Sequence, residues 1–351
     1  MREGIELLAH LSACFGPTSC EGEVASAVEA ELAGLPLALQ KDAMGNLTAH
    51  IEGPEGAPRV MLSAHMDEVG FMITEIDEDG FLRFDNLGGI DARVLCGRNV
   101  LIGDEEKRVP GVIAAKGIHL QDREERKKIP TADELYIDIG ATDRANAEAL
   151  VSLGDFGVFD TPFAVFGKDG AYFRGKALDD RLGCALLVEL ARELTANPVP
   201  LDVWLCFTVR EEIGRSGALV TANRIRPDIA IVLETTAIAD IAEVKDSRRV
   251  ASVGAGGVLS LVDRSTIYDR ALVDRALSCA KKHDIPVQIK RYVSGGNDAA
   301  HIQKSGVGVR CLALSAATRY LHAPVSVAAR ADYEAMRALL VALLSELREE
   351  I

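Results

Sequence analysis

The 351-residue chain alternates between two patterns of apolar and polar positions. In the first pattern, nearly continuous runs of Val, Ile and Leu are typical of strands that are buried on both faces of a parallel sheet. These runs cover residues 59–64, 199–209 and 228–233. In the second pattern, apolar side chains recur at helical spacing, over residues 180–195 and 332–349. The alternation predicts an α/β fold, with a mixed, largely parallel sheet and helices on both faces.

Residues 68–165 interrupt this alternation. They are rich in glycine and contain short alternating runs separated by turn residues, for example at 80–84, 99–102 and 109–113. Such a segment is typical of a small β-barrel or sandwich, and we expect an inserted small β-barrel domain. The predicted domains are therefore an α/β domain of residues 1–67 and 166–351 and a barrel domain of residues 68–165.

Charge and composition narrow the function classes. The formal net charge of −14 repels phosphate backbones and anionic membrane surfaces, which argues against nucleic acid or a membrane as partner. Residues 1–16 are typical of an amphipathic helix rather than a signal sequence, and the longest apolar run, residues 338–344, is too short to cross a bilayer. The seven cysteines have no Cys-x-x-Cys spacing, so no disulfide framework or thiolate metal site is expected. These features predict a cytoplasmic protein.

Acidic residues and histidines are concentrated where the apolar runs end. They are His65 and Asp67 after the run at 60–64, Glu211 and Glu212 after 201–209, Glu234 after 229–233, and His322 after 309–315. A further pair, Asp179 and Asp180, opens the helix at 180–195. Because ligands of open parallel sheets bind at the carboxyl ends of the strands, we expect these side chains to converge.

Each of these signals has a simpler explanation when it is taken alone. A His-x-Asp sequence after a strand is typical of a hydrogen-bonded turn, and paired aspartates at a helix start are typical of N-caps. Carboxylates that end buried strands, however, repel one another and lose hydration unless positive charge compensates them. Only Arg181 and Arg210 lie close in sequence. Two divalent metal ions per subunit compensate the set better, with zinc or cobalt as first choices and manganese as a further candidate.

Four motifs, in one order along the chain, resemble those of the glutamyl and tetrahedral aminopeptidases, a family of co-catalytic dinuclear metallopeptidases. They are Ser-Ala-His-Met-Asp-Glu-Val-Gly at 63–70, Gly-Lys-Ala-Leu-Asp-Asp-Arg at 175–181, Glu-Glu-Ile-Gly at 211–214 and Arg-Tyr-Leu-His-Ala-Pro at 319–324. The resemblance spans nearly the whole chain and includes residues 129–141 of the insertion. It implies a metal-dependent aminopeptidase that acts on peptides with a free N-terminus by means of a metal-bridging hydroxide.

The resemblance also implies roles for individual residues and for the insertion. The family uses five metal ligands and a general base. In this sequence these roles fall on Asp179 as the bridging ligand, His65 and Glu234 at one metal, Glu212 and His322 at the other, and Glu211 as the base. From the residues alone, Asp67, two positions after His65, is expected to hold the other ring nitrogen of that histidine. The inserted barrel is expected to control substrate access and to mediate self-association, in this family often into hollow dodecamers built from dimers.

One position departs from the family pattern. Glu234 stands where the family usually has aspartate, and its extra methylene moves the carboxylate without changing the type of ligand. Related co-catalytic enzymes with glutamate there include carboxypeptidases and N-acyl amide deacylases, and these activities stay open as alternatives. A non-catalytic shell or binding protein on the same scaffold is a further alternative. The preferred N-terminal residue of the substrate, and the roles of His119, Asn297 and Asp298, do not follow from the sequence.

Overall fold

The main sheet of the protein has eight strands. The structure, a computed structural model, describes residues 2–347; residues 1 and 348–351, and with them the last two residues of the helix predicted at 332–349, lie outside the described part. From one edge to the other the strands are β1 (Ala38–Lys41), β2 (Leu47–Ile51), β12 (Asp202–Thr208), β3 (Arg59–His65), β13 (Ile229–Ala237), β16 (Arg310–Thr318), β14 (Gly257–Leu259) and β15 (Val287–Ile289).

The four strands at the centre of the sheet, β12, β3, β13 and β16, run parallel to one another. Antiparallel pairing occurs between β1 and β2, β2 and β12, and β14 and β16. In the centre, Leu62 of β3 lies level with Leu205 of β12 and Ile231 of β13, and all three side chains are buried. The unbroken apolar runs arise because both faces of these strands are covered. The predicted mixed, largely parallel sheet is confirmed.

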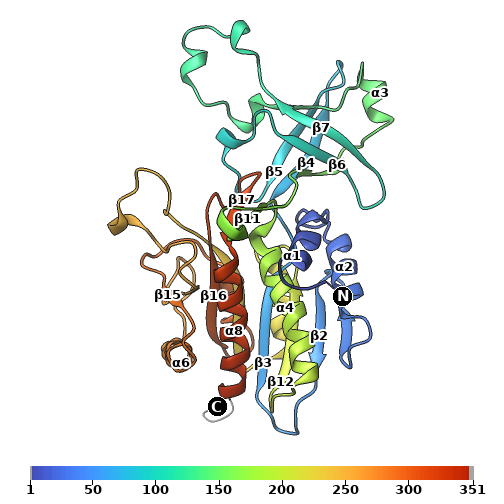
Figure 1. The fold of residues 1–351 in the computed structure, drawn as a ribbon. Helices are drawn as coiled ribbons and strands as arrows, with labels where there is room; N and C mark the ends of the chain where they lie inside the picture. Colours follow the sequence, from blue (N-terminus) through green and yellow to red (C-terminus); the bar gives the residue numbers. More distant parts are fainter. Residues whose placement is uncertain (1, 348–351) are drawn as a thin grey trace.

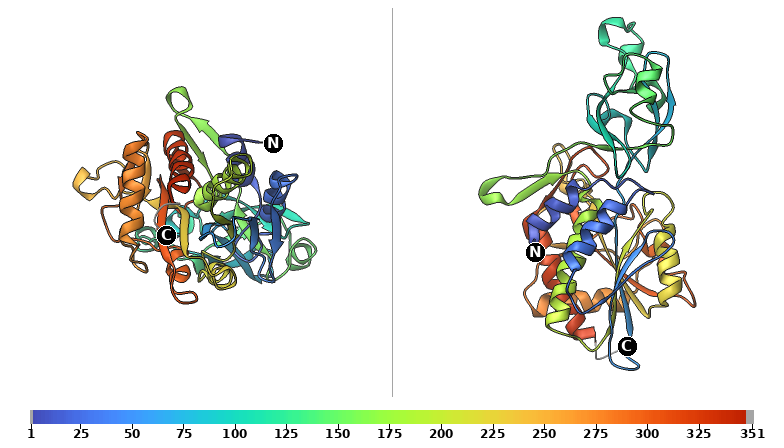
Figure 2. Two further views of the ribbon diagram at one scale, coloured as in Figure 1. Left: turned by 90° about the horizontal axis from the view of Figure 1, so that it is seen from below. Right: turned by 90° about the vertical axis from the view of Figure 1, so that its right-hand side faces the viewer.

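Helices cover both faces of this sheet (Figures 1 and 2). On one face lie α1 (Gly4–Ala13), α2 (Gly22–Leu32), α4 (Leu178–Ala196) and α8 (Arg330–Glu346), with α6 (Arg270–Lys282) packed beside α8; on the other face lie α5 (Ser216–Ile225) and α7 (Ala299–Ile302). The central helix α4 packs against β3 and β13, and its Leu182, Leu186 and Leu190 are buried. Among the described residues, no helix has both the length and the apolar character to cross a membrane. The cytoplasmic location stays a prediction.

The inserted segment forms a closed antiparallel barrel, which stands apart from the sheet at the top of Figure 1. Around the barrel the strands are β4 (Gly70–Ile76), β5 (Leu82–Leu87), β8 (Tyr136–Asp138), β7 (Arg108–Ala114), β6 (Asn99–Gly103) and β9 (Phe156–Phe159), and the short helix α3 (Arg144–Glu148) lies between β8 and β9 in sequence. The barrel has its own core, in which the ring of Phe71 meets those of Phe84 and Phe159 edge to face, each at a centroid distance of 5.1 Å. The predicted small β-barrel is confirmed.

A third, small sheet adjoins the point where the chain returns from the barrel. Its strands are β10 (Ala164–Phe166), β11 (Tyr172–Gly175) and β17 (Ser326–Ala329). Residues 164 and 165 end the predicted barrel domain yet belong to β10, which pairs with β11 rather than with the barrel. The domain boundaries stay a prediction.

The barrel is attached at the carboxyl edge of the main sheet. Strand β3 ends at His65 and the first barrel strand begins at Gly70, so residues 66–69 connect the two bodies. The other parallel strands, β12, β13 and β16, end at the same edge because they run in the same direction as β3. The fold therefore places the ends of four buried strands beneath an inserted domain (Figure 1).

Candidate metal centre

The polar residues that follow the apolar runs come together at this carboxyl edge. His65 is the last residue of β3, and Glu234 lies within β13. Glu211 and Glu212 follow β12, and His322 lies in the loop between β16 and β17. Asp179 is at the start of α4, where its backbone is not helical. Five segments that are distant in sequence thus contribute side chains to one place because the parallel strands end there.

Asp179 lies between two histidine and carboxylate groups. Its Oδ1 atom is 3.4 Å from Nε2 of His65, and that same nitrogen is 3.7 Å from Oε1 of Glu234. Its Oδ2 atom is 3.2 Å from Nε2 of His322, which is 3.3 Å from Oε1 of Glu212. Within each group the potential ligand atoms lie within 4.8 Å of one another. The two groups share only the Asp179 carboxylate, which presents one oxygen to each.

Backbone carbonyl groups orient both histidines. Nδ1 of His65 is 3.0 Å from the carbonyl oxygen of Asp67, and Nδ1 of His322 is 3.0 Å from the carbonyl oxygen of Gly89. When Nδ1 carries the proton and donates to the carbonyl, the lone pair of Nε2 points at the carboxylates, which is the arrangement seen in metal-binding histidines. Gly89 belongs to the inserted segment, so the barrel domain completes the second group.

A glycine is required where the inserted segment passes over the centre. Gly88 has φ of +85°, and a Cβ atom there would lie 2.8 Å from Cγ1 of Val69 and 3.3 Å from Cβ of Glu212. Both the backbone conformation and the lack of space exclude a side chain. Gly88 thus allows the loop to bring the neighbouring Gly89 carbonyl to His322.

The carboxylate of Asp67 holds the backbone of the two consecutive glutamates. It accepts hydrogen bonds from the backbone N–H groups of Glu211 at 3.0 Å and Glu212 at 3.1 Å, and from the Thr18 hydroxyl at 2.8 Å. Its Oδ1 atom is 3.4 Å from Nδ1 of His65, which is farther than the Asp67 carbonyl oxygen. The expected contact with His65 therefore comes first from the backbone of Asp67, and the side chain mainly fixes the loop that carries Glu211.

The two aspartates at the start of α4 have different contacts and different roles. Asp180 is fully buried and its Oδ1 accepts the backbone N–H of Gly183 at 2.9 Å, so the simple N-capping explanation holds for this residue. Asp179 has no such role and turns towards the histidines. The peptide bond between them is cis.

The centre holds more negative charge than its protein surroundings compensate. Burial raises the pKa of Glu212 to about 8 and that of Glu234 well above its usual range. Burial lowers the pKa of His322, but the Asp179 and Glu212 carboxylates outweigh it and raise that pKa to about 9. Oδ1 of Asp179 and Oε1 of Glu212 are buried without a hydrogen-bond partner. Imidazole nitrogens and orphaned carboxylate oxygens form a donor set that fits divalent cations such as zinc, cobalt or manganese.

Arg215 is the cation that contacts Glu211, and the sequence did not single it out. Arg181 is fully buried and bonds to Glu68 and to backbone carbonyl groups, and Nε of Arg210 is buried without a partner. Arg215 instead donates from Nε to Oε1 of Glu211 at 2.6 Å and from Nη2 to the carbonyl oxygen of Gly296 at 3.2 Å. The spacing of four residues between Glu211 and Arg215 was the available signal.

A cavity of about 320 Å³ opens beside the centre. It is lined by four acidic residues of the centre, Asp179, Glu211, Glu212 and Glu234, and by His322. Two of the three residues without a role from the sequence, Asn297 and Asp298, are buried nearby. Asn297 donates from Nδ2 to the Tyr268 hydroxyl at 3.1 Å, and Asp298 accepts from the Thr208 hydroxyl at 2.7 Å. The Asn297 contact ties the wall of the cavity to the loop before α6, and the Asp298 contact ties the adjacent residue to the end of β12.

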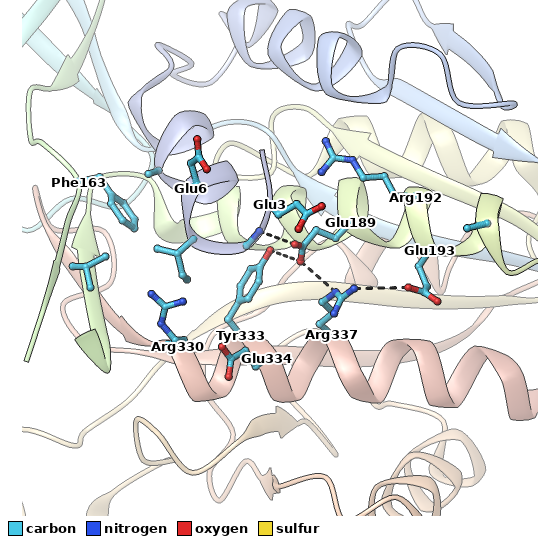
Figure 3. A pocket seen from close by; sticks show the side chains of 15 residues that line it. Glu3, Glu6, Phe163, Glu189, Arg192, Glu193, Arg330, Tyr333, Glu334 and Arg337 are labelled. Atoms are coloured by element: carbon cyan, nitrogen blue, oxygen red, sulfur yellow. Dashed lines mark hydrogen bonds and ion pairs between the residues drawn. The ribbon is translucent and has the colours of Figure 1, made fainter. Parts of the chain in front are cut away.

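A larger cavity, of about 810 Å³, lies between α1, α4 and α8 (Figure 3). Its buried carboxylate, Glu189, accepts hydrogen bonds from the Gly4 N–H at 2.7 Å and the Tyr333 hydroxyl at 3.0 Å, and pairs with Arg337 at 3.5 Å. None of the residues of the metal centre lines this cavity. The larger cavity is therefore not the one that the candidate metal ligands line; Asp179, Glu212, Glu234 and His322 line the smaller one.

Comparisons with known proteins agree on one family. The family described as M42 glutamyl aminopeptidase matches residues 45–339. The lysyl aminopeptidase of Pyrococcus furiosus is 31% identical over 311 residues, covering 88% of this chain and 86% of that protein. A TET aminopeptidase from a marine sediment Thaumarchaeota archaeon has a TM-score of 0.94 and 34% identity, over 98% of this chain and 96% of the other. The Pyrococcus horikoshii TET1 peptidase, which can assemble into a tetrahedron or a large octahedral shell, has a TM-score of 0.87 and 35% identity. The match covers 97% of this chain and 99% of the other.

The pKa shifts at the centre predict how the stability of the metal-free protein depends on pH. The pKa of Glu212 rises from 4.5 to about 8 and that of His322 from 6.5 to about 9, so between pH 5 and 9 the folded state binds more protons than the unfolded state. Stability must then fall as the pH rises through this range. We expect the melting temperature of chelated protein, measured by scanning fluorimetry, to be highest near pH 5 and to fall towards pH 9.

The variant Glu212→Gln should flatten this dependence, whereas Glu78→Gln, at an exposed position, should leave it unchanged. Added divalent metal should restore stability at high pH, by about 2.7 kcal/mol at a free concentration 100 times the dissociation constant. A melting temperature of chelated protein that is constant or rises from pH 5 to 9 would contradict the charge balance described above.

Proposed function

This chain belongs to the M42 glutamyl aminopeptidase family, and from that membership and the geometry of the centre we propose that it is a metal-dependent aminopeptidase that removes N-terminal residues from peptides. One observation carries the proposal. The Asp179 carboxylate directs Oδ1 to His65 and Oδ2 to His322, and each histidine has a further carboxylate beside it. A shared carboxylate between two three-ligand groups is the arrangement that a two-metal hydrolase needs.

The proposed ligands are His65 and Glu234 for one ion, Glu212 and His322 for the other, and Asp179 for both. When bound, two divalent ions polarise a carbonyl group and lower the pKa of a water molecule, which permits hydrolysis at neutral pH. Zinc and cobalt are our first candidates and manganese a further one, because all three accept imidazole with carboxylate. Glu234 stands where the family usually has aspartate, and it still offers a carboxylate as ligand.

Glu211 is the proposed general base and acid. Burial raises its pKa, which suits a group that must accept a proton and release it again near neutral pH. Arg215 holds Oε1 of Glu211 at 2.6 Å, and Oε2 has no hydrogen-bond donor among residues 2–347. Oε2 is therefore the oxygen that would take a proton from the attacking water and deliver it to the leaving amine. Asp67 keeps the backbone of Glu211 in place for this transfer.

The substrate class is tested with matched free and blocked substrates. Chelated protein, restored with zinc, cobalt or manganese in turn, should hydrolyse amino-acyl p-nitroanilides with a free α-amine, and should not hydrolyse the same compounds with an acetylated amine. Faster hydrolysis of acetylated compounds would instead support the deacylase alternative, and release of C-terminal residues from peptides the carboxypeptidase alternative. If none of these substrates is hydrolysed, the alternative of a non-catalytic shell protein is supported.

Removal of the proposed base separates chemistry from metal binding. Glu211→Gln should lower kcat by about 10² to 10⁴ while the metal content per chain, measured by plasma mass spectrometry, stays that of the unaltered protein. Asp179→Asn is the matched comparison, since loss of the shared carboxylate should lower both activity and metal content. Full activity of Glu211→Gln would exclude Glu211 as the base.

We further propose that the chain forms a large homo-oligomer, a dodecamer built from dimers, through its barrel. The TET1 relative assembles into closed shells, and the loop at the end of this barrel carries three exposed apolar side chains, Ile118, Leu120 and Ile129. Light scattering after size exclusion should give a mass of about twelve chains. The double variant Ile118→Asp with Leu120→Asp should give smaller species, whereas Leu39→Asp on the edge strand β1 should not. A monomeric unaltered protein would contradict this assembly.

A further inference from the structure

A second set of possible metal ligands lies where α6 meets the end of α8, far from the barrel at the lower end of the ribbon in Figure 1. Cys279, His283 and Glu346 offer a thiol, an imidazole and a carboxylate whose ligand atoms lie within 4.8 Å of one another. Among residues 2–347, the other groups of His, Cys, Asp or Glu that come equally close all belong to the centre at the carboxyl edge. The α6–α8 group shares no residue with that centre.

Helical geometry places the thiol and the imidazole on one face of α6. Cys279 and His283 are four residues apart, and the backbone N–H of His283 donates to the carbonyl oxygen of Cys279 at 3.1 Å, so the helical turn continues as far as His283. Side chains at this spacing are neighbours on a helix surface. Glu346, the last residue of α8, approaches from the neighbouring helix, and its Oε1 is 2.8 Å from Nε2 of His283. Two helices therefore direct three ligand types at one point.

The carboxylate of Glu346 is the anionic member of this group. Lys282 donates to its Oε1 at 2.8 Å, and this hydrogen bond lowers the pKa of Glu346, so the group is ionised at neutral pH. Burial, together with the charge of Glu346, raises the pKa of the Cys279 thiol to about 11, and the thiol donates to the same carboxylate. The Lys282 ammonium is largely exposed and can turn to solvent when another cation takes its place at Glu346.

The surroundings and the ligand types favour zinc. Both α6 and α8 end at this point, and the partial negative charge at a helix C-terminus attracts cations. Zinc bonds thiolate, imidazole and carboxylate at about 2.0 to 2.3 Å, which in a tetrahedron puts ligand atoms roughly 3.3 to 3.6 Å apart. The present separations reach this value by small rotations of the exposed His283 and the partly exposed Glu346. A thiolate selects zinc or cobalt over magnesium and calcium.

We propose that Cys279, His283 and Glu346 bind one zinc ion, separate from the ions of the candidate metal centre, and that this ion joins α6 to the end of α8. On binding, the Cys279 thiol releases its proton to solvent, the ion replaces Lys282 at Glu346, and a water molecule completes the tetrahedron. The sequence predicted no thiolate metal site, because it has no Cys-x-x-Cys spacing and Glu346 lies 63 residues beyond His283. The site does not depend on the proposed aminopeptidase function.

Cobalt(II) tests this site directly, because a cobalt–thiolate bond gives a strong near-ultraviolet charge-transfer band that the nitrogen and oxygen ligands of the centre do not give. Chelated and reduced protein should develop this band on titration with cobalt, and added zinc should remove it. Cys279→Ser should lose the band, whereas Cys96→Ser, at an exposed cysteine, should keep it. His283→Ala should weaken zinc binding at this site by at least about tenfold. Plasma mass spectrometry should find one zinc ion fewer per chain in Cys279→Ser.

The possible outcomes are distinct. A missing band in the unaltered protein, or a band that persists in Cys279→Ser, would overturn the zinc site. Cys279 is buried, so the exposed His283 supplies an independent check that leaves the core intact, and unchanged zinc affinity in His283→Ala would also overturn the site. Hydrolysis of free-amine substrates by Cys279→Ser should equal that of the unaltered protein. A protein that shows the band but hydrolyses no substrate would keep this site and lose the aminopeptidase function.

Discussion

Burial of several carboxylates at one place is the constraint on which the centre depends. Asp179, Glu211 and Glu234 are all less than 10% exposed, and Oδ1 of Asp179 and Oε1 of Glu212 are buried without a hydrogen-bond partner. Such a cluster is unfavourable in the protein alone, because desolvation and mutual repulsion both oppose its ionisation. The same cluster becomes favourable once divalent cations are bound. The fold thus maintains a local excess of negative charge. In the proposed function, two bound divalent cations compensate this charge.

The parallel sheet makes this concentration of charge possible. Four parallel strands end at one edge, so a residue at the end of each lies near the others without any long loop to carry it. The buried apolar residues beneath the edge, such as Leu62 and Leu205, keep these strand ends in register. The barrel is attached at the same edge and supplies the Gly89 carbonyl that orients His322. Any movement of the barrel relative to the sheet would therefore change the geometry of one metal group.

Two further contacts fix the proposed base and its neighbour in place. Asp67 fixes the backbone of Glu211 and Glu212, and Arg215 fixes one oxygen of the Glu211 carboxylate. This leaves a single oxygen of Glu211 for the proposed proton transfer, an arrangement that would lower the cost of orienting the proposed base.

The sequence by itself determined the class of fold, because continuous apolar runs and helical spacing reflect whether one or both faces of an element are buried. It also determined the candidate ligands, since His65, Glu212 and Glu234 all stand at or after the ends of such runs. Only the tertiary structure decided that Asp179 lies between two groups while Asp180 caps a helix, and that Arg215 rather than Arg181 is the cation beside Glu211. It alone revealed the part of Gly89. These contacts join residues that are far apart along the chain or choose between adjacent ones, and the direction of a side chain is fixed by packing against distant elements rather than by its own neighbours in sequence.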